Sequence, residues 1–274
     1  MRVAIAAAAI RIGGDTARLD AELLAAHALG LSREAMLMGH LDDPVPESFE
    51  PLVARRAAGE PLAYITGTRD FWTITLRVAP GVLIPRPDSE TLIEAALSHF
   101  GTEAPSRVLD LGTGSGALLL AALDQWPAAC GLGIDRSEAA LAIAQGNAVA
   151  LGLADRAEFH LGDWTQGLSM PFDLVLCNPP YVESGAELSR EVAEHEPASA
   201  LYAGEDGLDD YRRLAPAIGP LIAPGGVALF EIGATQGEAV VALFRQCGHA
   251  PRLIPDLAGR DRCVAVNGPI TDRR

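Results

Sequence analysis

The sequence has 274 residues, a length that favours two domains, or one large domain with an appendage, at about 150 residues per domain. Hydrophobic residues make up 49% and charged residues 21%, so the composition excludes a disordered chain. The formal net charge of −15 argues against broad nucleic-acid binding, which needs clustered Lys and Arg. All 21 residues counted as Lys or Arg are Arg, and the absence of Lys excludes lysine Schiff-base chemistry and a Walker-type phosphate lysine.

The cysteines and the longest apolar segments exclude further classes of protein. The sequence has four cysteines, Cys130, Cys177, Cys247 and Cys263. Their spacing fits neither a metal site nor a disulfide framework, so we expect no bound metal and a reducing, cytoplasmic location. The apolar run 3–10 could imitate a short signal peptide, but it continues into a helical pattern, and we expect no secretion. No stretch reaches the ~20 apolar residues that span a bilayer, so we expect no membrane partner.

The N-terminal quarter of the chain predicts helices. Apolar residues recur at helical spacing over 15–30, and Gly30 is a plausible stop. Ser32 is a capping residue for a short helix that follows it, and 46–58 forms a further helical stretch. These patterns predict a small all-helical domain over residues 1–69.

A β-branched, alternating segment follows the helices. Residues 71–78 alternate apolar and polar side chains up to Pro80-Gly81, and a second apolar run covers 82–84. The pattern predicts a β-hairpin over residues 70–87 that links two domains.

The remainder, residues 88–274, alternates short apolar strands with helical segments. The strand candidates are 107–111, 131–135, 157–160, 172–177 and 226–231, with helices around 116–125, 137–150 and 208–221. Such βα units predict an α/β fold, a Rossmann-like, mostly parallel sheet covered on both faces. The segments 251–254 and 263–266 predict a terminal antiparallel pair, which makes seven strands in all.

A glycine-rich turn follows the first of these strands. In residues 108–116 a predicted buried strand is followed by a glycine-rich turn, after which a helix begins. The unpaired backbone N–H groups at the N-terminus of that helix are available to bind a ligand. The candidate ligand-binding residues are Asp110, Gly112, Thr113, Gly114, Ser115 and Gly116. Because Ala117 also completes a G-x-G-x-x-A pattern, a dinucleotide site or a purely structural turn remains an alternative at this point.

Acidic residues follow the next two strands. Asp135 ends a strand, where a carboxylate can accept from both hydroxyls of an adenosine ribose or cap the following helix. Asp163 and Trp164 follow the third strand. Asp163 could accept from an adenine amine while Trp164 packs on the ring, although a single Trp in a loop also serves simple packing.

The motif Asn178-Pro179-Pro180-Tyr181 directly follows the strand 172–177. Two prolines restrain the backbone and remove two N–H donors, which leaves carbonyl oxygens as acceptors. Asn178 adds a side-chain carbonyl, and Tyr181 adds a flat aromatic wall. Such a site suits a planar group that carries an NH2, and we predict that these four residues carry the catalysis.

Together these motifs resemble class I S-adenosylmethionine-dependent methyltransferases that modify planar nitrogens. Further stretches narrow the resemblance to the release factor glutamine methyltransferases, the PrmC/HemK family. They are 60–67, Phe71-Trp72, 82–90, Glu196-Pro197, 204–208, 231–233 and Gln236-Gly237. The resemblance covers about residues 19 to 267, and one departure is Asp88-Ser89, where the family more often has Glu-Thr.

This resemblance implies N5-methylation of the glutamine in the Gly-Gly-Gln loop of peptide chain release factors, with S-adenosylmethionine as cofactor. It assigns cofactor binding to the residues from Asp110 to Gly116 named above and to Asp135, Asp163, Trp164 and Asn178. It also implies that the N-terminal helices recognise the protein substrate. The alternatives are glutamine methylation of a ribosomal protein, amino-group methylation of adenine or guanine in nucleic acid and, from another class, a nucleotide-binding oxidoreductase or a non-catalytic module.

Overall fold

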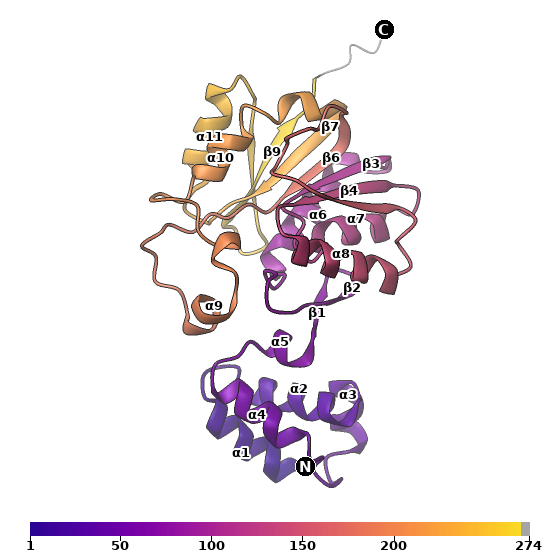
Figure 1. Cartoon of the computed structure of the whole chain (residues 1–274), viewed down its shortest axis with the longest axis vertical. Coiled ribbons are helices and arrows are strands. Elements are labelled where there is room, and N and C mark those ends of the chain that lie inside the picture. Colours follow the sequence, from indigo (N-terminus) through magenta and orange to yellow (C-terminus); the bar gives the residue numbers. More distant parts are fainter. Residues whose placement is uncertain (270–274) are drawn as a thin grey trace. The chain divides into compact units, whose positions relative to one another are not determined.

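The computed structural model describes residues 1–269, which form two compact units. Residues 1–68 and 188–195 form the first, which we call the helical unit. Residues 69–187 and the described residues from 196 onward form the second, the sheet unit. Figure 1 shows the elements of both.

The helical unit contains the predicted N-terminal helices and one segment from later in the chain. Its helices are α1 (Arg2–Ile12), α2 (Ala17–Leu29), α3 (Arg33–Gly39), α4 (Phe49–Ala57), α5 (Leu62–Thr66) and α9 (Arg190–His195). Gly30 ends α2 in the left-handed region, and the Ser32 hydroxyl accepts from the Ala35 N–H at 3.1 Å, as expected for a cap. Both predicted boundary signals are confirmed.

The core of the helical unit includes the run that imitates a signal peptide. Ile5 and Ala8 of α1 are buried among side chains such as Leu24, Met36 and Val53. The segment 188–195 is held by Arg56, whose guanidinium contacts Glu191 at 2.8 Å and Asp20 at 2.7 Å. Within residues 1–269, no helix combines the length and hydropathy required to cross a membrane.

The predicted hairpin is present, but its strands and turn differ from the prediction. The strands are β1 (Thr68–Phe71) and β2 (Ile74–Arg77), and the chain turns at Trp72-Thr73 rather than at Pro80-Gly81. Trp72 adopts a φ of +54°, and its N–H donates to the Glu90 carboxylate at 2.9 Å. A partner 18 positions away therefore stabilises a turn that the local alternation does not indicate.

A seven-stranded sheet dominates the sheet unit, with strand order β5-β4-β3-β6-β7-β9-β8. Its strands are β3 (Arg107–Leu111), β4 (Cys130–Asp135), β5 (Ala157–Leu161), β6 (Phe172–Cys177), β7 (Ile222–Glu231), β8 (Arg252–Pro255) and β9 (Asp261–Asn267). Strands β3 to β7 pair in parallel, and β9 pairs antiparallel with both β7 and β8. The predicted parallel sheet with a terminal antiparallel pair is confirmed.

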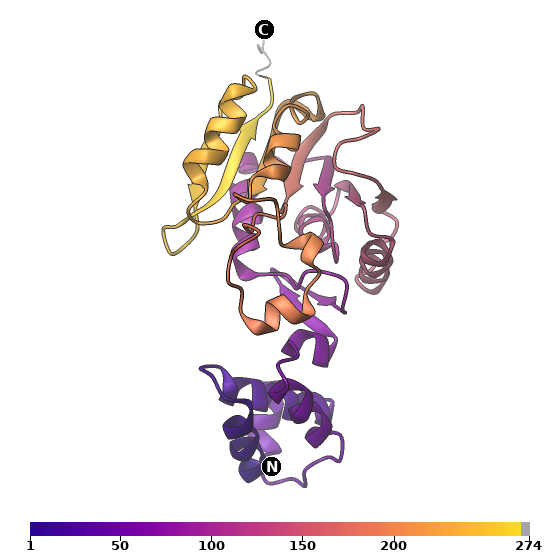
Figure 2. The same cartoon turned by 60° about the vertical axis from the view of Figure 1, so that its left-hand side comes forward.

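Helices cover both faces of the sheet (Figure 2). Alternate residues of the central strands enter two separate cores, one on each face. On one face Leu174 and Leu176 pack with α6 (Glu90–Phe100) and α7 (Ala117–Gln125). On the other, Val175 and Cys177 pack with α10 (Asp209–Leu214) and α11 (Gly237–Gln246). The continuous apolar strands of the sequence reflect this burial on both faces.

The remaining elements are short or flank the sheet. They are α8 (Glu138–Ala150) and the 3-10 helices η1 (Pro87–Ser89), η2 (Ala198–Ala200) and η3 (Gly219–Leu221). The single helix expected over 208–221 is instead α10 followed by η3. Pro216 lacks an N–H and disfavours the helical conformation of the preceding residue, so α10 ends before it.

Candidate functional site

The glycine turn between β3 and α7 forms one side of the site. Gly112, Gly114 and Gly116 all have positive φ angles, of +73°, +55° and +83°. The positive φ of Gly112 favours glycine, and a Cβ there would also make a tight contact of 3.1 Å with the Trp164 ring. The N–H groups of Gly112 and Thr113 donate to the Ile134 carbonyl at 2.9 and 3.0 Å, which anchors the turn to β4.

Asp135, at the end of β4, holds this turn in place. One carboxylate oxygen accepts from the Gly114 N–H and the other from the Ser137 N–H, both at 2.9 Å. Ser137, rather than Asp135, caps α8 by accepting from the Ala140 N–H. A carboxylate has about four acceptor positions, so Asp135 retains capacity for ligand hydroxyls.

Asp110 lies beneath the turn and is almost fully buried. Its Oδ2 accepts from the Thr113 hydroxyl at 2.7 Å and from the Leu119 N–H at 3.3 Å. Burial raises the pKa of Asp110 to about 7. Its Oδ1 is buried and has no hydrogen-bond partner within the described chain, an arrangement that suits a cationic ligand group.

The backbone carbonyl of Ser115 connects the turn to the rest of the sheet unit. It accepts from the buried Asn147 side chain at 2.9 Å, and the same side chain also bonds to both backbone groups of Arg77. The site thus depends on Asn147, which the sequence analysis did not single out because a lone Asn inside a helical pattern carries no distinctive signal.

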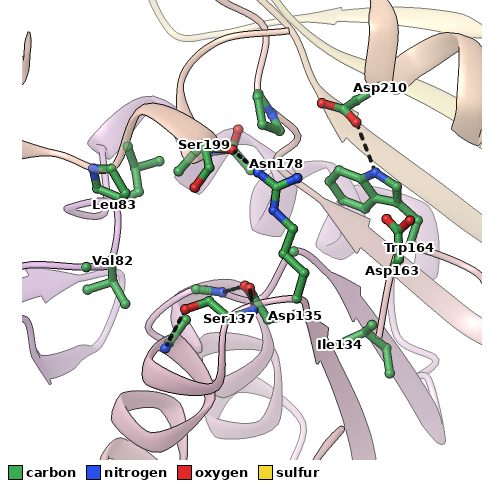
Figure 3. A pocket seen from close by; sticks show the side chains of 18 of the residues that line it. Val82, Leu83, Ile134, Asp135, Ser137, Asp163, Trp164, Asn178, Ser199 and Asp210 are labelled. Carbon is green, nitrogen blue, oxygen red and sulfur yellow. Dashed lines mark hydrogen bonds between the residues drawn. The ribbon is translucent and has the colours of Figure 1, made fainter. Parts of the chain in front are cut away.

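A cavity of about 350 Å³ opens beside the turn (Figure 3). Of the predicted site residues, it brings together Gly112, Gly114, Asp135, Asp163, Trp164, Asn178 and Pro180. Residues that the sequence analysis missed also line it, including Val82, Leu83, Arg136, Ser199 and Asp210. Its volume is typical of small-molecule sites.

Trp164 forms one end of the cavity and is held in a single orientation. Its φ is +52°, uncommon for a bulky residue, and its ring N–H donates to Asp210 Oδ1 at 3.0 Å (Figure 3). Burial raises the pKa of Asp210. Asp163 lies beside the ring and pairs with Arg213 at 2.5 Å through Oδ2, so its Oδ1 is the oxygen that remains to accept from a ligand.

The Asn178-Pro179-Pro180-Tyr181 motif begins where β6 ends. Asn178 donates through Nδ2 to the Ser89 hydroxyl at 3.1 Å, and Pro179 is buried. Tyr181 packs against the core that contains α10 and α11, and its hydroxyl donates to Glu231 at 3.2 Å. Burial and the adjacent Glu231 carboxylate raise the pKa of Tyr181, so its hydroxyl stays protonated at neutral pH.

The opposite wall comes from two segments more than 100 positions apart in the chain. Val82 and Leu83 lie on one, and Pro197, Ser199 and Ala200 on the other. The buried Glu196 joins them, because its carboxylate accepts from the Ile84 N–H at 3.3 Å and pairs with the Arg86 guanidinium. Arg136 adds a link across the cavity by donating to the Ser199 carbonyl at 3.1 Å.

No group of three or more His, Cys, Asp or Glu residues with metal-binding geometry occurs within the part of the chain that the structure describes. All four cysteines are free, and Cys177 and Cys263 are buried.

Comparisons with known proteins place the chain in a family. Residues 6–67 match the PrmC N-terminal domain, and residues 86–200 match the methyltransferase small domain. The release factor glutamine methyltransferase of Rhodospirillum rubrum is 46% identical over 92% of this chain and 79% of its own length. That of Cereibacter sphaeroides is 46% identical over 94% of this chain and 93% of its own.

Solved structures agree on the fold of the sheet unit. The catalytic domain of hMettl16 superimposes with a TM-score of 0.57 at 14% identity, covering 77% of this chain and 81% of its own. A methyltransferase from Pyrococcus furiosus gives a TM-score of 0.53 at 15% identity, covering 71% and 89%. The sequence identity to the curated relatives is far higher, and the chain belongs to the release factor glutamine methyltransferases, a family of S-adenosylmethionine-dependent enzymes.

Proposed function

We propose that this protein methylates the side-chain N5 nitrogen of the glutamine in the Gly-Gly-Gln loop of peptide chain release factors. The observation that carries the proposal is that Asn178 and Pro180, from the Asn178-Pro179-Pro180-Tyr181 motif, line the same cavity as the glycine turn. The names of the relatives support the same substrate.

The residues around the cavity fit S-adenosylmethionine. Asp135 has acceptor capacity for ribose hydroxyls, and Trp164 and Asp163 offer an aromatic face and a carboxylate oxygen for an adenine. The buried Oδ1 of Asp110 suits the cofactor's ammonium group. We assign cofactor binding to these residues and to Gly112, Thr113, Gly114, Ser115, Gly116 and Asn178.

The cofactor supplies an electrophilic methyl carbon on a sulfonium, so the protein's task is to position the acceptor nitrogen. An amide nitrogen is a poor nucleophile because its lone pair is delocalised into the carbonyl. If Asn178 Oδ1 and the Pro179 carbonyl accept its two hydrogens, they orient the nitrogen and increase its electron density. When the nitrogen bonds to the methyl carbon, the sulfur–methyl bond breaks and leaves a neutral thioether, and one of the two amide hydrogens leaves as a proton to solvent.

We also assign residues 1–69 to recognition of the release factor, 70–87 to the linker and 88–274 to methyl transfer. The four cysteines are free, two buried and two exposed, and free thiols are compatible with a cytoplasmic enzyme. The net charge of −15 gives no support to stable nucleic-acid binding.

The test is methyl transfer from labelled S-adenosylmethionine to a purified release factor, to the same factor with its loop glutamine changed to alanine, and to total RNA. We expect label on the intact factor alone. Label on RNA would favour nucleic-acid amino-group methylation. Absence of label on the factor together with label on ribosomal protein would favour that substrate instead.

A further inference from the structure

The proposed reaction requires the Asn178 side-chain amide to present its oxygen, rather than its nitrogen, to the substrate amide. The side-chain carbonyl Oδ1 can accept a hydrogen bond from a substrate amide, whereas Nδ2 can only donate one. Rotation of the amide by half a turn would exchange the two atoms and present a donor to another donor. The reaction proposed above therefore needs a group that selects one orientation.

Ser89 contacts the Asn178 side chain in the sheet unit. Its hydroxyl oxygen accepts from Asn178 Nδ2 at 3.1 Å, and Ser89 itself is only 4% exposed. It is the last residue of η1, and α6 follows directly. The contact joins two segments that lie 89 positions apart in the sequence.

The Ser89 side chain also lies close enough to the buried Glu231 carboxylate to favour its ionised form. Burial raises the pKa of Glu231 to about 7, and Ser89 opposes that rise, as does the Tyr181 hydroxyl, which donates to Glu231 at 3.2 Å. A hydroxyl stabilises a carboxylate by turning its hydrogen towards it, so the Ser89 oxygen presents its lone pairs to Asn178. A rotated amide would place Oδ1 against those lone pairs.

Neighbouring contacts keep Ser89 close to Glu231. Asp88, one residue earlier, pairs with Arg262 Nη2 at 3.0 Å. Arg262 Nη1 in turn donates to the Ile232 carbonyl, next to Glu231, at 3.3 Å. Arg262, in β9, thus connects η1 with the residue that follows β7, through an ion pair to Asp88 and a hydrogen bond to Ile232.

We propose that Ser89 is a positioning residue that orients the Asn178 amide so that Oδ1 is the free acceptor for the substrate's amide hydrogen. Ser89 relays the acceptor character of the buried Glu231 carboxylate to Asn178. The inference rests on the proposed function, because it requires an NH2-bearing substrate. It also explains why a hydroxyl residue stands at this position, since Ser and Thr are equivalent in this role.

The experiment compares Ser89→Ala with Ser89→Thr in the full-length enzyme, with labelled S-adenosylmethionine and a purified release factor. Ser89→Ala should lower kcat about tenfold or more, with the cofactor Kd and the release-factor KM within about twofold of the unmodified enzyme. Ser89→Thr, which keeps the hydroxyl, should restore kcat to within about threefold. Thr91→Val, which removes another buried hydroxyl from the first turn of α6, is the matched control and should leave kcat unchanged.

Three results would overturn the proposal while the unmodified enzyme methylates the factor. They are an unchanged kcat for Ser89→Ala, an equal loss in Thr91→Val, and no recovery in Ser89→Thr. If Ser89→Ala does not fold, Ser89→Cys takes its place with the same expected loss, because a thiol is a weak hydrogen-bond partner. Failure of the unmodified enzyme to label the factor would instead reject the proposed function.

Discussion

The two walls of the cavity are built in different ways. The wall at the glycine turn is held mainly by backbone groups and short side chains, such as the Gly114 N–H on Asp135 and the Thr113 hydroxyl on Asp110. In the opposite wall one buried side chain, Glu196, joins segments that are remote in sequence, and Arg136 adds a hydrogen bond to the Ser199 carbonyl. The first wall therefore rests on several contacts close to its motif and on Asn147, whereas the two segments of the second wall meet at one buried carboxylate.

The largest effect should follow from a substitution that leaves both walls intact. Asn178→Ala removes the side-chain acceptor without touching the cofactor contacts at the glycine turn. We expect kcat to fall by about 100-fold or more, because the acceptor nitrogen loses its orientation, while cofactor binding survives at least in part. Parallel turnover and cofactor-titration assays check this, and near-normal turnover would remove Asn178 from its assigned role.

Substitution of Glu196 should break the second wall. Glu196→Ala leaves the Ile84 N–H and the Arg86 guanidinium without their shared acceptor, and we expect a loss of about 2 kcal/mol in the free energy of unfolding. Cofactor affinity should fall in the same variant, since the segment that contains Val82 and Leu83 loses its link to Glu196 at Ile84. Denaturant unfolding measures the first effect and titration the second.

Glu194→Ala provides the control for that variant, because Glu194 forms an exposed pair with Arg190. Its free energy of unfolding should change by less than about 0.5 kcal/mol. Equal losses in the two variants would contradict a special role for Glu196.

Substitution of Asp135 tests the first wall. Asp135→Ala removes the acceptor for the Gly114 and Ser137 N–H groups together with the proposed ribose acceptor. We expect the cofactor Kd to rise about 30-fold, with kcat at saturation changed little, because positioning of the acceptor amide is preserved. An unchanged Kd would remove Asp135 from the cofactor site.

The smallest effect is a pH dependence of cofactor affinity that originates at Asp110. Its pKa in the free protein is raised to about 7, and a bound ammonium group would stabilise the ionised form and lower that pKa. Binding then releases a proton below pH 7, so the Kd should fall as pH rises towards 7, by at most about tenfold per pH unit, and level off above it. Isothermal titration between pH 5.5 and 8.5 measures the slope, and a slope that persists in Asp110→Asn would contradict this origin.

Local sequence signals predicted the first wall well and the second poorly. A buried strand, glycines and a following helix define the turn around Gly112 within a few residues. By contrast, Val82 and Leu83 resemble a strand in sequence, but they lie in an irregular segment beside the cavity. Arg136 precedes α8 and Asp210 lies in the first turn of α10, where polar residues are ordinary, so only the folded chain shows that they line the cavity.

The hairpin illustrates the same limit. Alternation correctly indicated extended chain near residues 71–78, but the turn lies within that run, at Trp72, because Glu90 accepts its N–H. Local periodicity contains no information about a hydrogen-bond partner that folding brings close.

By itself, the sequence determined the parallel sheet with helices on both faces, the glycine turn and the proline motif that begins at Asn178. These features depend on strand hydrophobicity, on backbone angles available mainly to glycine and on the restraint of proline, all of which are local properties. Only the tertiary structure decided that Ser89 contacts Asn178 and that Glu196 joins two remote segments. Such contacts depend on buried polar groups finding partners in space, and sequence separation does not encode which partner is near.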